Sequence, residues 1–136
     1  MSPLEMVLWF KIVATLLLWA LPLLLIPTSL QKKWKLIAIE PPLFGRLLGL
    51  AYLALVVGYS SGIMTLRNGQ WPTAIIWMGL VSNGGALLLL LFSGIRGDWS
   101  SEAKPTKALL WLSAAVLAII TTGLVVYGLV EGPVWY

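Results

Sequence analysis

Four apolar stretches, each about as long as a helix needs to be to cross a bilayer, fill most of this sequence. They are residues 6–26, 43–64, 73–92 and 108–130. An α-helix rises about 1.5 Å per residue, so roughly 20 apolar residues cross a hydrocarbon core of about 30 Å. We therefore predict an all-α protein, an integral membrane four-helix bundle in which residues 1–136 form a single transmembrane domain.

The composition points to the same fold class. The chain is 60% hydrophobic, has a mean hydropathy of +0.94, and only 10% of its residues are charged. A soluble domain of 136 residues has too little interior to bury that much apolar surface. Cysteine and histidine are both absent, which excludes disulfides, thiolate metal sites and histidine-ligated metals. We therefore expect no metal site and, because no catalytic motif is present, no enzymatic activity; the sequence identifies no cofactor.

Basic residues are distributed unevenly between the two ends of the predicted bundle. Two of them, Lys11 and Arg67, fall on one side. Seven fall in or beside the connections 27–42 and 93–107, and these are Lys32, Lys33, Lys35, Arg46, Arg96, Lys104 and Lys107. Because cytoplasmic loops are enriched in Lys and Arg, we place both connections in the cytoplasm and both termini outside. The same rule suggests a bacterial inner membrane.

Aromatic side chains fall near both predicted membrane interfaces, where amphipathic rings collect. We interpret them as anchoring belts, with a ligand cage as the alternative. The outer belt comprises Trp9, Trp71, Trp135 and Tyr136, with Trp77 and Tyr127 a turn inside it, and the inner belt comprises Trp34, Trp99 and Trp111. Trp19 lies within the first stretch, and we expect it to fill a packing gap or to face lipid.

The segment Gln31–Lys35 (QKKWK) is basic and carries one aromatic residue. It places Lys32, Lys33, Trp34 and Lys35 at the predicted cytoplasmic surface. We interpret it as a topology signal that also contacts anionic lipid headgroups, each Lys contributing on the order of 1 kcal/mol. The alternative is a docking site for an acidic partner.

The second stretch contains two sets of small residues on nearly opposite helix faces. Gly45 and Gly49 form one set, and Gly58 and Gly62, with three further small residues, form the other. Small residues let helix backbones approach closely in lipid. We therefore predict a central helix that packs on two sides, and either both faces serve the bundle or one serves a partner subunit.

The third stretch carries Ser82-Asn83-Gly84-Gly85 near its middle, one turn after Gly79. A buried amide is costly in hydrocarbon unless it is hydrogen-bonded, so Asn83 must face protein, water or a ligand. One interpretation is a structural hydrogen bond between helices, with Gly79 making room for it. The other is a polar cavity or cofactor contact formed by Asn83 and Ser82.

Charged residues inside a span are the strongest functional signal in a membrane protein. No Asp or Glu lies in the middle of a predicted span, since Glu5, Glu40 and Glu131 fall at or beyond helix ends. We expect Lys11, two turns into the first helix, to extend its side chain to the outer surface. Arg46 is expected to do the same at the inner surface.

The stretch 46–55 (RLLGLAYLAL), at the start of the second predicted helix, resembles a pattern found in small four-helix DoxX-like bacterial membrane proteins. The resemblance covers ten residues. It implies a four-helix membrane fold. Because some members of that group accompany oxidoreductases that use quinones, it also implies a link to redox membrane proteins.

These observations favour a non-catalytic accessory or assembly subunit of a larger membrane protein complex, with redox and photosynthetic complexes as the candidates. Its expected partners are membrane lipids and other membrane-protein subunits. No nucleic-acid partner is expected, because the net charge of +4 fits topology. The alternatives are a binder of a small lipophilic molecule (a quinone, carotenoid or lipid) near Asn83, and a small transporter.

Overall fold

The computed structural model describes residues 1–36 and 41–132, and within these ranges every regular element is a helix. Four helical spans, Pro3–Leu25, Pro42–Arg67, Thr73–Arg96 and Lys104–Val130, are long and apolar enough to cross a membrane. The predicted all-α fold with four such helices is therefore confirmed. Three residues named in the predictions lie outside the described residues: Glu40, expected at a helix end, and Trp135 and Tyr136, expected in the outer aromatic belt.

Three of the four spans change helix type along their length. In chain order the elements are α1 (Pro3–Thr15), η1 (Leu16–Ala20), α2 (Leu21–Leu25), α3 (Thr28–Lys33), α4 (Pro42–Arg67), α5 (Thr73–Gly79), η2 (Leu80–Gly84), α6 (Gly85–Arg96), α7 (Lys104–Gly123) and η3 (Leu124–Val130), where η marks a π-helical segment. π-Helical segments widen a helix locally and are frequent at functional sites. Only α4 is α-helical throughout its span.

Two prolines shape the first span. Pro22 has no backbone N–H to donate and crowds the preceding turn, which predicts a distortion near Leu18–Ala20. The distortion is present as the π-helical segment η1, and the helix ends at Leu25, just before Pro27. The short helix α3, which follows Pro27, is a feature that hydropathy alone does not predict.

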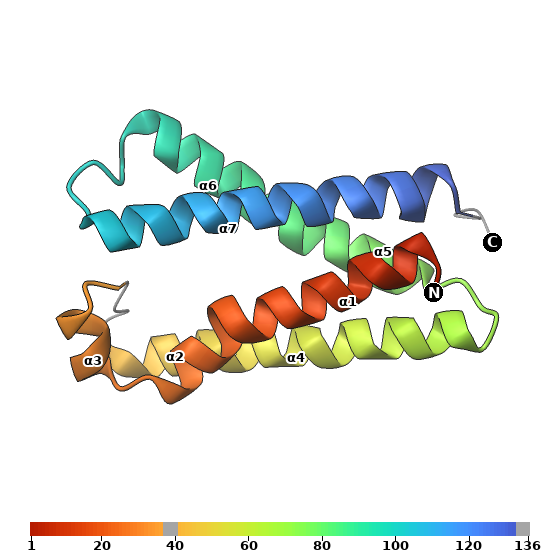
Figure 1. Cartoon of the computed structure of the whole chain (residues 1–136), viewed down its shortest axis with the longest axis horizontal. Helices are drawn as coiled ribbons and strands as arrows, with labels where there is room; N and C mark the ends of the chain where they lie inside the picture. The colour runs from red at the N-terminus through yellow and green to blue at the C-terminus, as the bar shows by residue number, and fades with distance from the viewer. Residues whose placement is uncertain (37–40, 133–136) are drawn as a thin grey trace.

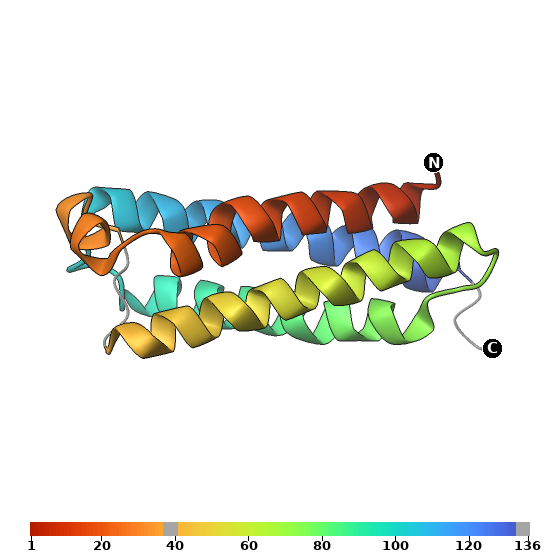
Figure 2. The same ribbon diagram turned by 90° about the horizontal axis from the view of Figure 1, so that it is seen from below.

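The spans form a four-cornered bundle in which two helix pairs dominate (Figures 1 and 2). The first span packs along α4 over its whole length, and α6 and η2 pack against α7. The two pairs are joined mainly at the N-terminal end, where α1 meets α7 and η3 and where α5 meets α4. Toward the α3 end, the α2/α4 pair and the α6/α7 pair diverge (Figure 1).

The buried core follows the same division. Its fully buried side chains come from α1, α4, α5, α7 and η3, and include Leu8, Tyr59, Ile76, Ile120 and Leu124. Neither α2 nor α6 contributes a fully buried residue among those described. The bundle therefore has one tightly packed half near the N-terminus and one loosely packed half near α3.

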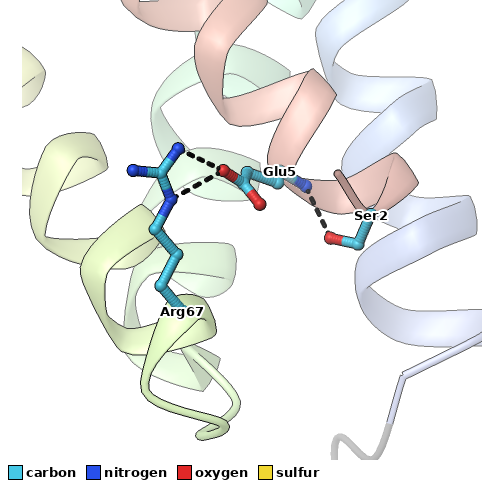
Figure 3. Close-up of polar contacts among 3 residues, drawn as sticks. All are labelled: Ser2, Glu5 and Arg67. Atoms are coloured by element: carbon cyan, nitrogen blue, oxygen red, sulfur yellow. Dashed lines mark hydrogen bonds and ion pairs between the residues drawn. The ribbon is translucent and has the colours of Figure 1, made fainter.

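An ion pair closes the packed end of the bundle (Figure 3). Ser2 caps α1 by accepting a hydrogen bond from the Glu5 backbone N–H at 3.2 Å. The Glu5 carboxylate accepts from Arg67 Nε and Nη2, at 2.9 and 2.8 Å. Because Glu5 is largely buried whereas Arg67 is mostly exposed, the pair chiefly compensates the Glu5 charge and ties the start of α1 to the end of α4.

Hydrogen bonds also hold the opposite end together. Arg46 donates to the Leu23 carbonyl and to the Ile26 carbonyl (2.9 Å for the second), so it satisfies acceptors left free where α2 ends. Arg46 is half-buried, and the expectation that its side chain extends to the inner surface stays a prediction. Thr106 Oγ1 donates to the Lys35 carbonyl at 2.6 Å, which joins the α3 segment to the start of α7.

Candidate functional site

A cavity of about 420 Å³ occupies the loosely packed half of the bundle. All four spans line it, and α3 and Leu36 close the end away from the N-terminus. Its wall is mostly aliphatic, formed by Leu18, Pro22, Leu23, Ile26, Leu48, Leu55, Ala86, Leu89, Leu90, Leu109, Leu110 and Leu117. The volume lies within the range of small-molecule sites, roughly 300–1,000 Å³.

Lys11 lies at the end of this cavity that is nearer to the packed core, together with the polar residues Ser82, Asn83 and Ser113. The whole residue is only 2% exposed, so the expectation that its side chain reaches the outer surface is wrong. Its ammonium stands 5.0 Å from the centre of the Trp19 ring and 5.7 Å from that of Tyr59. No hydrogen bond or ion pair joins it to any residue in the described part of the chain. Lys11 is thus a cation inside a span with aromatic faces, and no opposite charge, beside it.

Asn83 lies opposite, on η2, and is 1% exposed. Its Nδ2 donates to the Gly79 carbonyl at 2.6 Å and to the Tyr59 hydroxyl at 3.0 Å. A carbonyl can only accept, so this pairing fixes which way the amide points. Its Oδ1 is buried and receives no hydrogen bond from the described residues. Asn83 therefore links η2 to α4 and still holds one unused acceptor.

Ser82 belongs to the same polar group. Its Oγ lies 3.3 Å from the Tyr59 hydroxyl, and both Ser82 and Asn83 line the cavity. The two residues proposed from the sequence for cofactor binding are thus brought together at the cavity wall. Their role in binding stays a prediction.

Trp19 connects three spans around the cavity. Its ring stacks on Tyr52 of α4, with centroids 5.8 Å apart and planes at 27°. Its Nε1 donates to Ser113 Oγ of α7 at 3.1 Å. Trp19, Tyr52 and Ser113 all line the cavity, so Trp19 faces the bundle interior. Of the two expectations for Trp19, packing within the bundle is confirmed and a lipid-facing position is wrong.

The α3 end of the cavity is bounded by polar contacts to the first span. Gln31 is buried, lines the cavity and donates from Nε2 to the Pro22 carbonyl at 3.5 Å. The other residues of the basic segment, Lys32, Lys33, Trp34 and Lys35, are exposed at the surface. The segment therefore has one residue turned into the bundle and four at the surface, where headgroup or partner contact stays a prediction.

The glycines singled out in the sequence lie against neighbouring helices of the same chain. A Cβ on Gly49 would stand 2.9 Å from Leu24, one on Gly62 would stand 2.9 Å from Ile75, and one on Gly58 would stand 3.1 Å from Met78. On Gly79 it would stand 2.6 Å from Leu124. Gly45 is buried as well. Gly49 of α4 thus faces the first span on one side, and Gly58 and Gly62 face α5 on the other, both inside the bundle.

Sequence reasoning missed the main residues of the polar cluster, namely Lys11, Trp19, Tyr52, Tyr59 and Ser113. One signal for Lys11 was available. Leu4, Leu8, Lys11 and Thr15 recur at helical spacing and share the buried face of the first span. The sequence could not identify that face as the inner one, because every face of the span is apolar.

The fold and the cavity together define a class of protein: a four-helix bundle of membrane-spanning length with a ligand-sized, mainly apolar cavity that has one polar end. Comparison of the chain with models of protein families, with curated proteins and with solved structures finds no match. The resemblance to DoxX-like proteins therefore stays a prediction.

Proposed function

We propose that this protein binds a small lipophilic molecule inside its helix bundle, with the polar group of that molecule at the Lys11 end of the cavity. The observation that carries the proposal is the cavity of about 420 Å³ with a buried, unpaired ammonium at one end. An ionisable residue inside a span is rare, and by default it marks a ligand, ion or proton pathway. A mostly aliphatic wall with a few convergent polar groups is the usual form of a small-molecule site.

The packing of the α4 glycines also bears on the competing hypothesis, that the protein is an accessory subunit of a larger complex. The accessory-subunit hypothesis drew on a surplus of small residues on α4, available for a partner helix. Gly49, Gly58 and Gly62 lie instead against Leu24, Met78 and Ile75 of the same chain. The hypothesis has no observation in its favour comparable with the cavity, so we propose ligand binding as the primary function.

The proposal includes a location and an orientation. We propose a bacterial inner membrane, with α3 and the connection between α6 and α7 at the cytoplasmic surface. In support, both segments lie at the same end of the bundle, opposite to the N-terminus (Figure 1). Six of the nine basic residues lie in or beside them, namely Lys32, Lys33, Lys35, Arg96, Lys104 and Lys107.

Filling the cavity is expected to displace the ligand without removing any polar group. Ala86 lines the aliphatic part of the cavity, so Ala86→Phe should occupy space that the ligand needs. We expect the lipophilic molecule that organic solvent extracts from purified wild-type protein to be reduced at least about tenfold in this variant, since a clash of this kind costs more than about 1.4 kcal/mol of binding. Mass spectrometry of the extracts measures it.

Ala115→Phe serves as the matched control, because Ala115 also lies in the middle of a span but is exposed on the outside of α7. It should retain the wild-type amount of ligand. Equal extraction from both variants and wild type would place the bound molecule outside the cavity and contradict the proposal.

A further inference from the structure

We infer that the molecule bound in the cavity is an acidic single-chain lipid, of which a fatty acid is the simplest case, held with its anionic head against the Lys11 ammonium. This inference rests on the proposed function and adds the chemical class of the ligand. It starts from the charge of the cavity wall. Lys11 is the one charged residue among those that line it.

The described carboxylates do not compensate that charge. Glu5 pairs with Arg67 at the N-terminal end, and Asp98 pairs with Arg96 beyond α6. Glu102 and Glu131 are exposed near the ends of α7 and η3. A buried charge is tolerated where an opposite charge stands beside it, and an isolated one is strongly unfavourable. A ligand that carries one negative charge would complete the site.

The groups around Lys11 suit an anion at this position. An ammonium has three N–H donors, and none of them is bonded to a described residue. The faces of Trp19 and Tyr59 attract the ammonium but supply no full negative charge. Ser113 borders the same Trp19 ring: it accepts from Trp19 Nε1, and its own hydroxyl proton makes no hydrogen bond to a described residue. Lys11 and Ser113 therefore offer donors to an incoming carboxylate.

The aliphatic part of the cavity determines which kind of hydrocarbon tail the ligand can have. From the polar end the aliphatic wall continues through Leu23, Leu48 and Leu89 to Ile26 and Leu36 near α3. A single hydrocarbon chain suits this mostly aliphatic wall and a cavity of about 420 Å³. A carotenoid hydrocarbon or a neutral quinone would leave the Lys11 charge without an opposite charge. The geometry therefore favours an acidic lipid over the neutral candidates.

The test compares probes of equal chain length on the full-length protein, stripped of bound lipid and held in a non-ionic maltoside detergent at pH 7. Dodecanoate and dodecane-1-sulfonate are the anionic probes, and the sulfonate is ionised at every accessible pH. Dodecan-1-ol and decyl-benzoquinone are the neutral probes. We expect native mass spectrometry to show both anions binding at least about tenfold more tightly than the alcohol, because the anions alone form an ion pair with Lys11.

Variants assign the preference to Lys11. In Lys11→Met the ratio of anion to alcohol affinity should fall to about one, while alcohol binding is retained. Lys33→Met, at an exposed position of α3, should keep the wild-type ratio.

Equal affinity of the wild-type protein for anionic and neutral probes would overturn the inference of an acidic ligand and leave the proposed function intact. A preference that survives in Lys11→Met would also overturn it. Failure of all four probes to bind the wild-type protein would overturn the proposed function together with the inference. If Lys11→Met does not fold, the ratio of anion to alcohol affinity in the wild-type protein decides by itself whether the ligand is acidic.

Discussion

Replacing Lys11 with methionine is expected to raise the stability of the ligand-free protein. Methionine matches lysine in length and flexibility, so the substitution removes the charge with little change in packing. The effective penalty of a buried ion is several kcal/mol, whereas a desolvated ammonium–aromatic contact, such as those with Trp19 and Tyr59, returns on the order of 2 kcal/mol. We therefore expect the free energy of unfolding to increase by about 1–3 kcal/mol.

The measurement is thermal unfolding in detergent after removal of bound lipid, because a ligand stabilises the wild type and masks the difference. Lys33→Met, at an exposed position of α3, should leave the unfolding temperature unchanged. A clear loss of stability in Lys11→Met would mean that the ammonium is satisfied within the ligand-free bundle. That result would remove the argument that a ligand must complete the site.

Gly79→Leu is expected to prevent recovery of folded protein. A Cβ at this position would stand 2.6 Å from Leu124 Cδ1 and 3.3 Å from the Tyr59 hydroxyl. Both neighbours are fully buried, so neither has space to move into. Even Gly79→Ala should lower the free energy of unfolding by about 1–3 kcal/mol, because the added methyl group overpacks the site. The larger side chain should also break the contacts of Asn83 with Tyr59 and with the Gly79 carbonyl. Unfolding by titration with a denaturing detergent measures both variants.

Gly85 provides the control for this prediction, since it lies less than two turns further along the same span. A Cβ at Gly85 would meet nothing within 4 Å. Gly85→Ala should therefore be neutral, or stabilising by roughly 0.5–1 kcal/mol through helix propensity. If Gly79→Ala were as stable as Gly85→Ala, the close packing of α5 on η3 and Tyr59 would be contradicted.

The fold could be predicted from the sequence because it depends on hydropathy over long windows. The predicted stretches 6–26 and 108–130 correspond to the spans Pro3–Leu25 and Lys104–Val130. The spans extend past the predicted limits where polar residues such as Glu5 and Lys104 continue a helix, since hydropathy marks apolar length and not helix ends. Pro22 and Pro27 act locally, so their effects were also predictable.

The candidate site depended on packing that no local pattern encodes. Ser82 and Asn83 were recognised because polar residues in the middle of a span are conspicuous. Lys11 was assigned to the surface on the assumption that a long side chain near a helix end reaches water. In the structure it turns toward Trp19, two turns further along the helix, because that direction leads into the cavity between the helix pairs.

The division of the bundle explains how one small protein can hold both a stable core and a binding site. The contacts between the two helix pairs and the Glu5–Arg67 ion pair concentrate at the N-terminal end. The cavity lies at the other end, where α2 and α6 contribute no fully buried residue among those described. We expect binding in the loosely packed half to order α6 and α3 rather than the core.

The most direct test of ligand binding is native mass spectrometry of the wild-type protein released gently from the membranes that contain it. If the protein binds a ligand in its cavity, we expect a folded protein that carries one small lipophilic molecule of defined mass. This molecule should be released when the detergent concentration or the collision energy is raised. A folded protein without any bound small molecule, recovered instead in fixed stoichiometry with larger membrane subunits, would contradict the account and favour the accessory-subunit hypothesis.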